Sequence, residues 1–159
     1  MVEIIDLVSE TFFEPIIKKR AACRGIVIKD NKILLSYEKN NDIYMSPGGG
    51  IENGESLKAC CEREVLEETG LLVRAQEQVF TVNEYVFNEL YVAHYFLCEI
   101  IGEGELSLTK TEIEHGMEPV WVPLCGAIEI FSRYKEKTPD HASLYLREYT
   151  ILTKYINKR

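Results

Sequence analysis

The segment from Gly49 to Leu71 constrains this chain more than any other part of its sequence. Three consecutive glycines and an Asn-Gly pair precede a run of strong helix formers without Gly or Pro. Gly70 follows that run, where a left-handed C-terminal cap would stand. We therefore predict a loop that can approach a ligand closely, followed by a helix over Ser56–Thr69.

Three glutamates of the predicted helix share one face. At about 100° per residue, Glu64, Glu67 and Glu68 fall within an arc of roughly 100°. Such carboxylates repel each other and raise their own pKa values, and a divalent cation such as Mg²⁺ relieves the repulsion because it prefers oxygen ligands. A solvated acidic surface is the alternative. Less polar residues on the same side favour a face turned toward the protein, and these are Leu57, Cys60 and Cys61.

The rest of the chain predicts strands in the middle and helices near the end. Strands are expected at Ala21–Lys29, Lys32–Glu38, Ile43–Met45, Leu71–Asn88, Glu89–Ile101 and Val120–Val122. The first two should form a hairpin around Asp30–Asn31, and the two long ones an antiparallel pair. Helices are expected at Ala127–Tyr134 and Asp140–Asn157, the latter with Asp140 as N-cap. This order predicts an α/β fold with a mixed sheet covered on both faces, in one domain spanning residues 1–159.

Composition excludes several classes of protein. The net charge of −8 disfavours binding to duplex nucleic acid, and no apolar run is long enough to cross a bilayer. The N-terminus does not resemble a secretory signal, and five cysteines without CxxC spacing fit a reducing, cytoplasmic location. Lys18, Arg20 and Arg24 could bind phosphate, although solvated surface positions are the simpler interpretation.

The segment resembles the Nudix box, the signature of a hydrolase family. The pattern is Gly, five residues, Glu, seven residues, then Arg-Glu-apolar-any-Glu-Glu-any-Gly-apolar, and it begins here at Gly49 with Glu55 as the first glutamate. Arg63 to Leu71 complete it without a departure. The apolar hairpin that ends in Ser-Pro-Gly-Gly before the box and the Trp121–Leu124 run after it are also usual in this family. The resemblance implies a Nudix-type α/β/α sandwich with a catalytic loop-helix-loop and a C-terminal helix.

The resemblance also implies roles for individual residues. The ligands of Mg²⁺ or Mn²⁺ would be the Gly49 carbonyl and the carboxylates of Glu64, Glu67 and Glu68. Glu64, or else Glu67, would act as general base, and Arg63 would orient the neighbouring carboxylates. A further acidic ligand is expected from a later loop. Glu114 is the candidate for that ligand, with Glu112 and Glu118 as competitors and solvated loop acids as the alternative interpretation.

These residues predict hydrolysis of a pyrophosphate bond in a small nucleotide-like substrate, a nucleoside diphosphate linked to another group. A non-catalytic sensor domain on the same fold is the first alternative, and an isomerase-like relative is the second. The intact glutamate set argues against the sensor, and the unaltered box argues against the isomerase. A homodimer is common among similar proteins, and the box leaves the identity of the nucleotide open.

Overall fold

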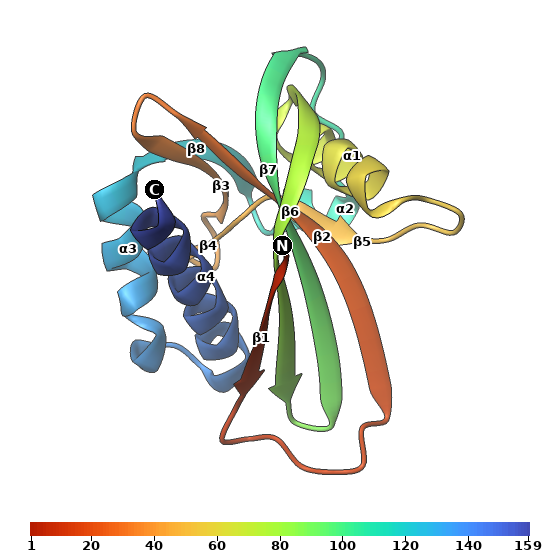
Figure 1. Ribbon diagram of the computed structural model, residues 1–159, viewed down its shortest axis with the longest axis vertical. Helices are drawn as coiled ribbons and strands as arrows, with labels where there is room; N and C mark the ends of the chain where they lie inside the picture. The colour runs from red at the N-terminus through yellow and green to blue at the C-terminus, as the bar shows by residue number, and fades with distance from the viewer.

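The computed structural model describes residues 1–159, and its strands form one mixed sheet of eight strands (Figure 1). The strands are β1 (Glu3–Val8), β2 (Lys18–Lys29), β3 (Lys32–Glu38), β4 (Ile43–Met45), β5 (Gly48–Gly50), β6 (Leu71–Val86), β7 (Glu89–Glu103) and β8 (Met117–Pro123). Their order across the sheet is β1-β6-β7-β2-β3-β4, with β5 paired to β2 and β8 paired to β3. β1 is parallel to β6 and β2 is parallel to β7, while the other pairs are antiparallel.

Helices cover both faces of this sheet (Figure 1). They are α1 (Leu57–Thr69), α2 (Lys110–Glu114), α3 (Leu124–Ser132), the 3₁₀ turn η1 (Tyr134–Glu136) and α4 (Pro139–Lys158). α1 packs on one face, and α3 and α4 pack on the other. The α/β/α sandwich with a mixed sheet is therefore confirmed. None of the helices combines the length and the apolar composition needed to span a membrane.

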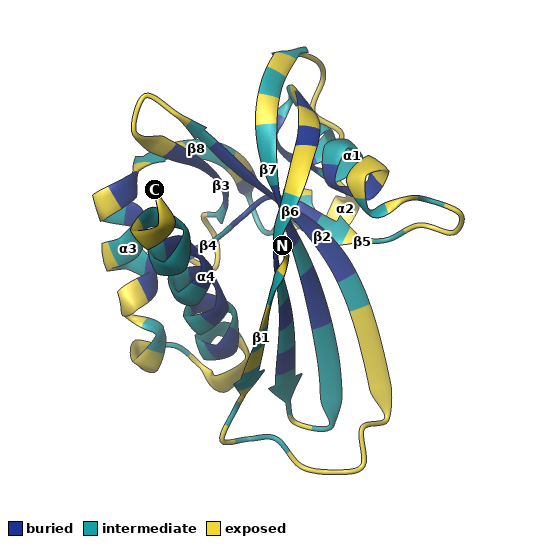
Figure 2. Cartoon of the chain, in the orientation of Figure 1, coloured by how far each residue is buried: buried dark blue, intermediate teal, exposed yellow.

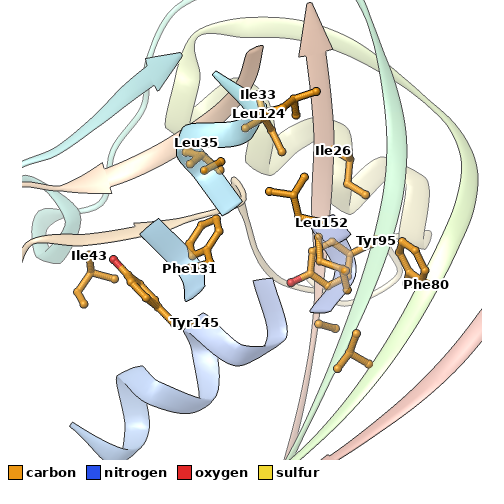
Figure 3. Packing of buried hydrophobic residues seen from close by; sticks show 14 residues of the cluster. Ile26, Ile33, Leu35, Ile43, Phe80, Tyr95, Leu124, Phe131, Tyr145 and Leu152 are labelled. Atoms are coloured by element: carbon orange, nitrogen blue, oxygen red, sulfur yellow. The ribbon is translucent and has the colours of Figure 1, made fainter. Parts of the chain in front are cut away.

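The protein has two apolar clusters, one on each side of the sheet. Figure 2 shows the buried segments along the strands and on the helix sides that face them. The larger cluster joins the sheet to α3 and α4, with Phe80, Tyr95, Phe131 and Tyr145 among its fully buried members (Figure 3). The smaller cluster lies under α1 and contains Cys60, Cys61 and Val65. All five cysteines are free thiols.

The predicted hairpins are present, with shifted ends. Asp30 and Asn31 both have positive φ, of 51° and 60°, as a two-residue hairpin turn requires. β2 begins at Lys18 instead of Ala21, because its first residues pair with β7. The turn between β6 and β7 lies at Phe87–Asn88, one residue earlier than expected.

Four elements were not predicted, and one cap was wrong. β1 adds an edge strand beside β6, β5 and α2 form inside segments that we expected to be loops, and the 3₁₀ turn η1 follows α3. Asp140 is not the N-cap of the last helix, because Thr138 stands at that position and Pro139 takes the first helical one. Proline suits that place, since its fixed φ is helical and it has no N–H group to satisfy. The helix expected at Ala127–Tyr134 begins earlier, at Leu124, and ends at Ser132.

Candidate active site on the glutamate helix

The ends of α1 follow from its sequence. The Ser56 hydroxyl accepts a hydrogen bond from the Ala59 N–H (3.1 Å), which caps the first turn. Gly70 closes the last turn with φ at 73°, and its N–H donates to the Leu66 carbonyl (2.9 Å). The predicted helix and its glycine cap are therefore confirmed. They place the glutamate face of α1 against β5 and the loop that precedes it.

Arg63 organises the acidic groups around it. Its Nε and Nη2 donate to the two carboxylate oxygens of Glu55 (2.7 and 3.0 Å). Its Nη1 donates to Glu64 (2.7 Å) and to Glu67 (3.1 Å), and Nη2 also reaches the Gly50 carbonyl (3.0 Å). The bidentate pairing lowers the pKa of Glu55 to about 2. One guanidinium therefore holds two carboxylates of α1 beside the glycine strand.

Glu64 lies in direct contact with Gly49. A Cβ atom at position 49 would stand 2.6 Å from the Glu64 carboxyl carbon, so a larger residue would force the Glu64 side chain to move. Gly49 therefore lets this strand of backbone lie next to the carboxylate that Arg63 holds. Burial raises the pKa of Glu64, and the hydrogen bond from Arg63 opposes that rise.

Glu68 is buried between β3 and the start of β5. Only 4% of it is exposed, and one carboxylate oxygen accepts hydrogen bonds from the Ser36 hydroxyl (2.7 Å) and the Gly48 N–H (3.1 Å). Burial raises its pKa to about 8. Glu64, Glu67 and Glu68 do not form a ready cluster of three carboxylates, so their convergence on one cation stays a prediction. Arg63 gathers Glu64 and Glu67, and Glu68 is anchored separately.

The structure distinguishes among the three later acids. Glu112 lies near enough to α1 to raise the pKa of both Glu64 and Glu68. Its carboxylate also accepts from the Thr109 N–H (3.0 Å) in the capping box of α2. Glu114 and Glu118 are exposed, and Glu114 contributes only its backbone carbonyl, to Asn40 (2.8 Å). These contacts favour Glu112 over Glu114 as the later acid, and the choice between them stays a prediction.

The residues present are chemically suited to a hard divalent cation. Carboxylates of Glu64 and Glu67 and the neighbouring Gly49 carbonyl are all oxygen donors, which Mg²⁺ and Mn²⁺ accept. Because Gly49 has no side chain, the backbone of β5 lies close to the Glu64 carboxylate. The only contact of the Gly49 carbonyl outside the sheet is a weak one, from the Cys60 thiol at 3.5 Å.

A buried polar network around Glu148 of α4 was not predicted from the sequence. Glu148 of α4 accepts hydrogen bonds from the Ser46 N–H (3.2 Å), the Ser46 hydroxyl (2.7 Å) and the Tyr95 hydroxyl (3.1 Å). This ties the last helix to the loop that enters β5. A signal was available, because Glu148 stands three residues after Tyr145 and four before Leu152, on the apolar face of the helix.

A cavity of about 560 Å³ opens beside the glycine strand. Its lining includes Gly49, Gly50, Tyr91 and the three arginines Arg20, Arg24 and Arg147. This volume lies within the range of about 300–1,000 Å³ that is common for small-molecule sites. The interpretation of Arg24 as a solvated surface residue is wrong, since only 7% of it is exposed. Sheet pairing explains this, because β2 lies between β7 and β5 at Arg24.

Comparison with known proteins shows the family to which this chain belongs. Residues 19–146 match the sequence profile of the NUDIX domain. The chain belongs to the Nudix family. An ADP-ribose pyrophosphatase of Methanocaldococcus jannaschii is 34% identical over 119 residues, covering 64% of this chain and 70% of the relative. The mouse diphosphoinositol polyphosphate phosphohydrolase 3-alpha is 30% identical over 129 residues, covering 79% and 74%.

Solved structures show the same fold. A Nudix hydrolase from Nitrosomonas europaea superposes with a TM-score of 0.63 at 21% identity, over 84% of this chain and 89% of that one. The protein is accordingly a Nudix-type pyrophosphohydrolase, as its complete box predicts. The family assignment covers α1, the glycine strand and the sheet that carries the cavity.

Proposed function

We propose that this Nudix hydrolase uses Mg²⁺ or Mn²⁺ to cleave the diphosphate of a nucleoside diphosphate linked to another group. ADP-ribose is the first substrate to test, because a relative at 34% identity bears the name ADP-ribose pyrophosphatase. The observation that carries the proposal is the Arg63-held pair of Glu64 and Glu67 beside the Gly49 strand. Water would attack phosphorus, and a P–O bond of the anhydride would break to give two phosphate monoesters.

The residues would divide the work as follows. Glu64, Glu67 and the Gly49 carbonyl would hold the cation, with Glu68 as a further ligand and Glu112 as the added acid in place of Glu114. When bound, such a cation neutralises phosphate oxygens and lowers the pKa of a water molecule. Glu64, or else Glu67, would act as general base instead of as a cation ligand, because a carboxylate bound to a cation is a poor proton acceptor.

Arg63 would act as a positioning residue. It holds the carboxylates of Glu64 and Glu67 in fixed orientations, and Glu55 fixes Arg63 in turn through two hydrogen bonds. A carboxylate held in this way needs little reorganisation before it accepts a proton from water. The buried link from Glu148 to Ser46 would keep the glycine strand in register with α1.

A substrate panel tests the proposal. Purified protein is incubated with ADP-ribose, a UDP-sugar, a dinucleoside tetraphosphate and a diphosphoinositol polyphosphate, each with Mg²⁺ or with EDTA, and the products are identified. We expect Mg²⁺-dependent cleavage of ADP-ribose to AMP and ribose 5-phosphate. Glu67→Gln should lower turnover by several orders of magnitude, whereas Glu77→Gln, an exposed glutamate of β6, should not.

Other outcomes point elsewhere. If the protein prefers the diphosphoinositol compound, the substrate class in the proposal changes from a nucleotide to an inositol phosphate, and the cleavage of a pyrophosphate bond stays the same. Tight binding of one compound without cleavage of any would favour the sensor alternative. The homodimer and the cytoplasmic location also stay predictions, to be checked by light scattering and by fractionation of the cells that make the protein.

A further inference from the structure

Arg24 is a buried cation that forms no salt bridge. Its Nη1 donates to the Ser46 carbonyl (2.7 Å) and its Nη2 to the Tyr91 hydroxyl (3.0 Å). Its Nε is the one buried side-chain nitrogen or oxygen in the molecule that has no hydrogen-bond partner. Because a guanidinium carries five N–H donors, three of them lack an acceptor.

The second buried arginine shows what a compensated charge looks like in this fold. Arg147 donates to Glu84 (2.8 Å) and lies 3.5 Å from Glu148, so carboxylates balance it. Arg24 forms no salt bridge, although the protein has a net charge of −8 and an excess of carboxylates. A buried charge without an ion partner is costly to folding. A ligand that supplies the missing anion would recover that cost.

Arg24 stands where a substrate anion would be. Arg24 of β2 pairs with Gly48 of β5, and the next residue of β5, Gly49, lies against the Glu64 carboxylate. Arg24 and Gly49 both line the cavity. Arg20 lies four residues earlier on the same strand, so both side chains leave the same face of β2.

Tyr91 joins the two arginines. The Arg20 guanidinium is 5.6 Å from the centre of the Tyr91 ring, and the hydroxyl of that ring accepts from Arg24. Arg20 is exposed and also has no salt bridge. Two acids of the lining are already paired, Glu84 with Arg147 (2.8 Å) and Glu89 with Lys18 (3.7 Å), and Asp140 accepts a hydrogen bond from Thr138 (2.9 Å). The arginines of β2 are therefore the cations of this wall that form no salt bridge, although Glu68 and Glu148 lie near enough to interact with the charge of Arg24.

We propose that Arg24, assisted by Arg20, forms a phosphate-binding subsite at the wall of the cavity next to Gly49. It would take a phosphate group of the nucleoside diphosphate substrate, and so it rests on the proposed function. Guanidinium groups suit phosphate because two parallel N–H donors match two of its oxygens. The subsite would orient the diphosphate relative to Glu64 without taking part in proton transfer.

Calorimetric binding of ADP in EDTA tests the subsite without metal or turnover. We expect Arg24→Gln to weaken ADP binding by about tenfold or more, and Arg20→Gln by about threefold. Adenosine, which has no phosphate, should bind the variants as it binds the wild-type protein. Arg74→Gln is the matched control, because it removes the same charge from an exposed position of β6 outside the cavity.

Each alternative gives a different result. Equal weakening of ADP and adenosine would mean that Arg24 only holds the Ser46 loop, and would overturn the proposal. Failure of the wild-type protein to bind either ADP or inorganic pyrophosphate would also overturn it. Should Arg24→Gln not fold, Arg20→Gln decides, and an unchanged ADP affinity there refutes the subsite. Arginine-dependent ADP binding in a protein that cleaves nothing would instead refute the proposed function and leave the subsite standing.

Discussion

Replacing the buried Glu68 by Gln should remove a large pH dependence from the stability of the metal-free protein. Burial raises the pKa of Glu68 to about 8, whereas an unfolded chain leaves it near its usual 4.5. The folded protein therefore binds this proton more tightly than the unfolded chain does. The stabilisation is fully present below pH 4.5 and is lost as the pH rises through 8.

The size of the effect follows from the two pKa values. When the folded and unfolded pKa values differ by one, the free energy of unfolding changes by about 1.4 kcal/mol. The rise from 4.5 to about 8 therefore lowers the free energy of unfolding by at most about 5 kcal/mol at alkaline pH. Gln keeps an oxygen that can accept from the Ser36 hydroxyl and the Gly48 N–H, but it cannot ionise. The variant should lack this contribution at every pH.

Urea unfolding in EDTA at about pH 5, 7 and 9 gives the free energy of unfolding of the wild-type protein and of Glu68→Gln. The difference between the two proteins isolates the contribution of Glu68, because the other titrating groups are the same in both. Glu77→Gln serves as the control, because Glu77 is exposed. Mg²⁺ at about pH 9 should stabilise the wild-type protein more than Glu68→Gln, because the variant lacks one of the proposed ligands and ligand binding to the folded state raises its stability. Parallel curves for wild type and Glu68→Gln across this pH range would refute the reasoning.

Three further predictions concern turnover of whichever diphosphate the panel identifies. Gly49→Ala should lower the rate by about 100-fold, because its Cβ would displace the Glu64 carboxylate, while Gly50→Ala, which meets nothing within 4 Å, should keep most of the rate. Glu112→Gln should raise the Mg²⁺ concentration needed for half-maximal activity and Glu114→Gln should not; the reverse pattern in a metal titration would restore Glu114 as the ligand. The rate should rise from about pH 6 to 9, because the attacking water must lose a proton; a pH profile with its maximum at acid pH would contradict this mechanism.

Local features of this protein could be predicted from its sequence. Ser56 and Gly70 set the ends of α1, and Asp30–Asn31 sets the first hairpin turn, because caps and tight turns depend on residues a few positions apart. The spacing of the box likewise placed Arg63 within reach of Glu64 and Glu67. These contacts need only the periodicity of one helix, which the order of residues already contains.

The environment of each charged side chain was decided by the tertiary structure alone. Glu68 turns toward Ser36, which is 32 residues away, and Arg24 is buried because β2 joins β7 and β5 around it. The charge of Glu112 on α2 is felt by Glu64 of α1, and α4 brings Glu148 beneath the glycine loop. Burial and charge pairing arise from residues far apart in the chain, so they exist only once the sheet and helices have packed. Hence the sequence by itself determined the reaction class, while packing determined which acids and arginines meet at the site.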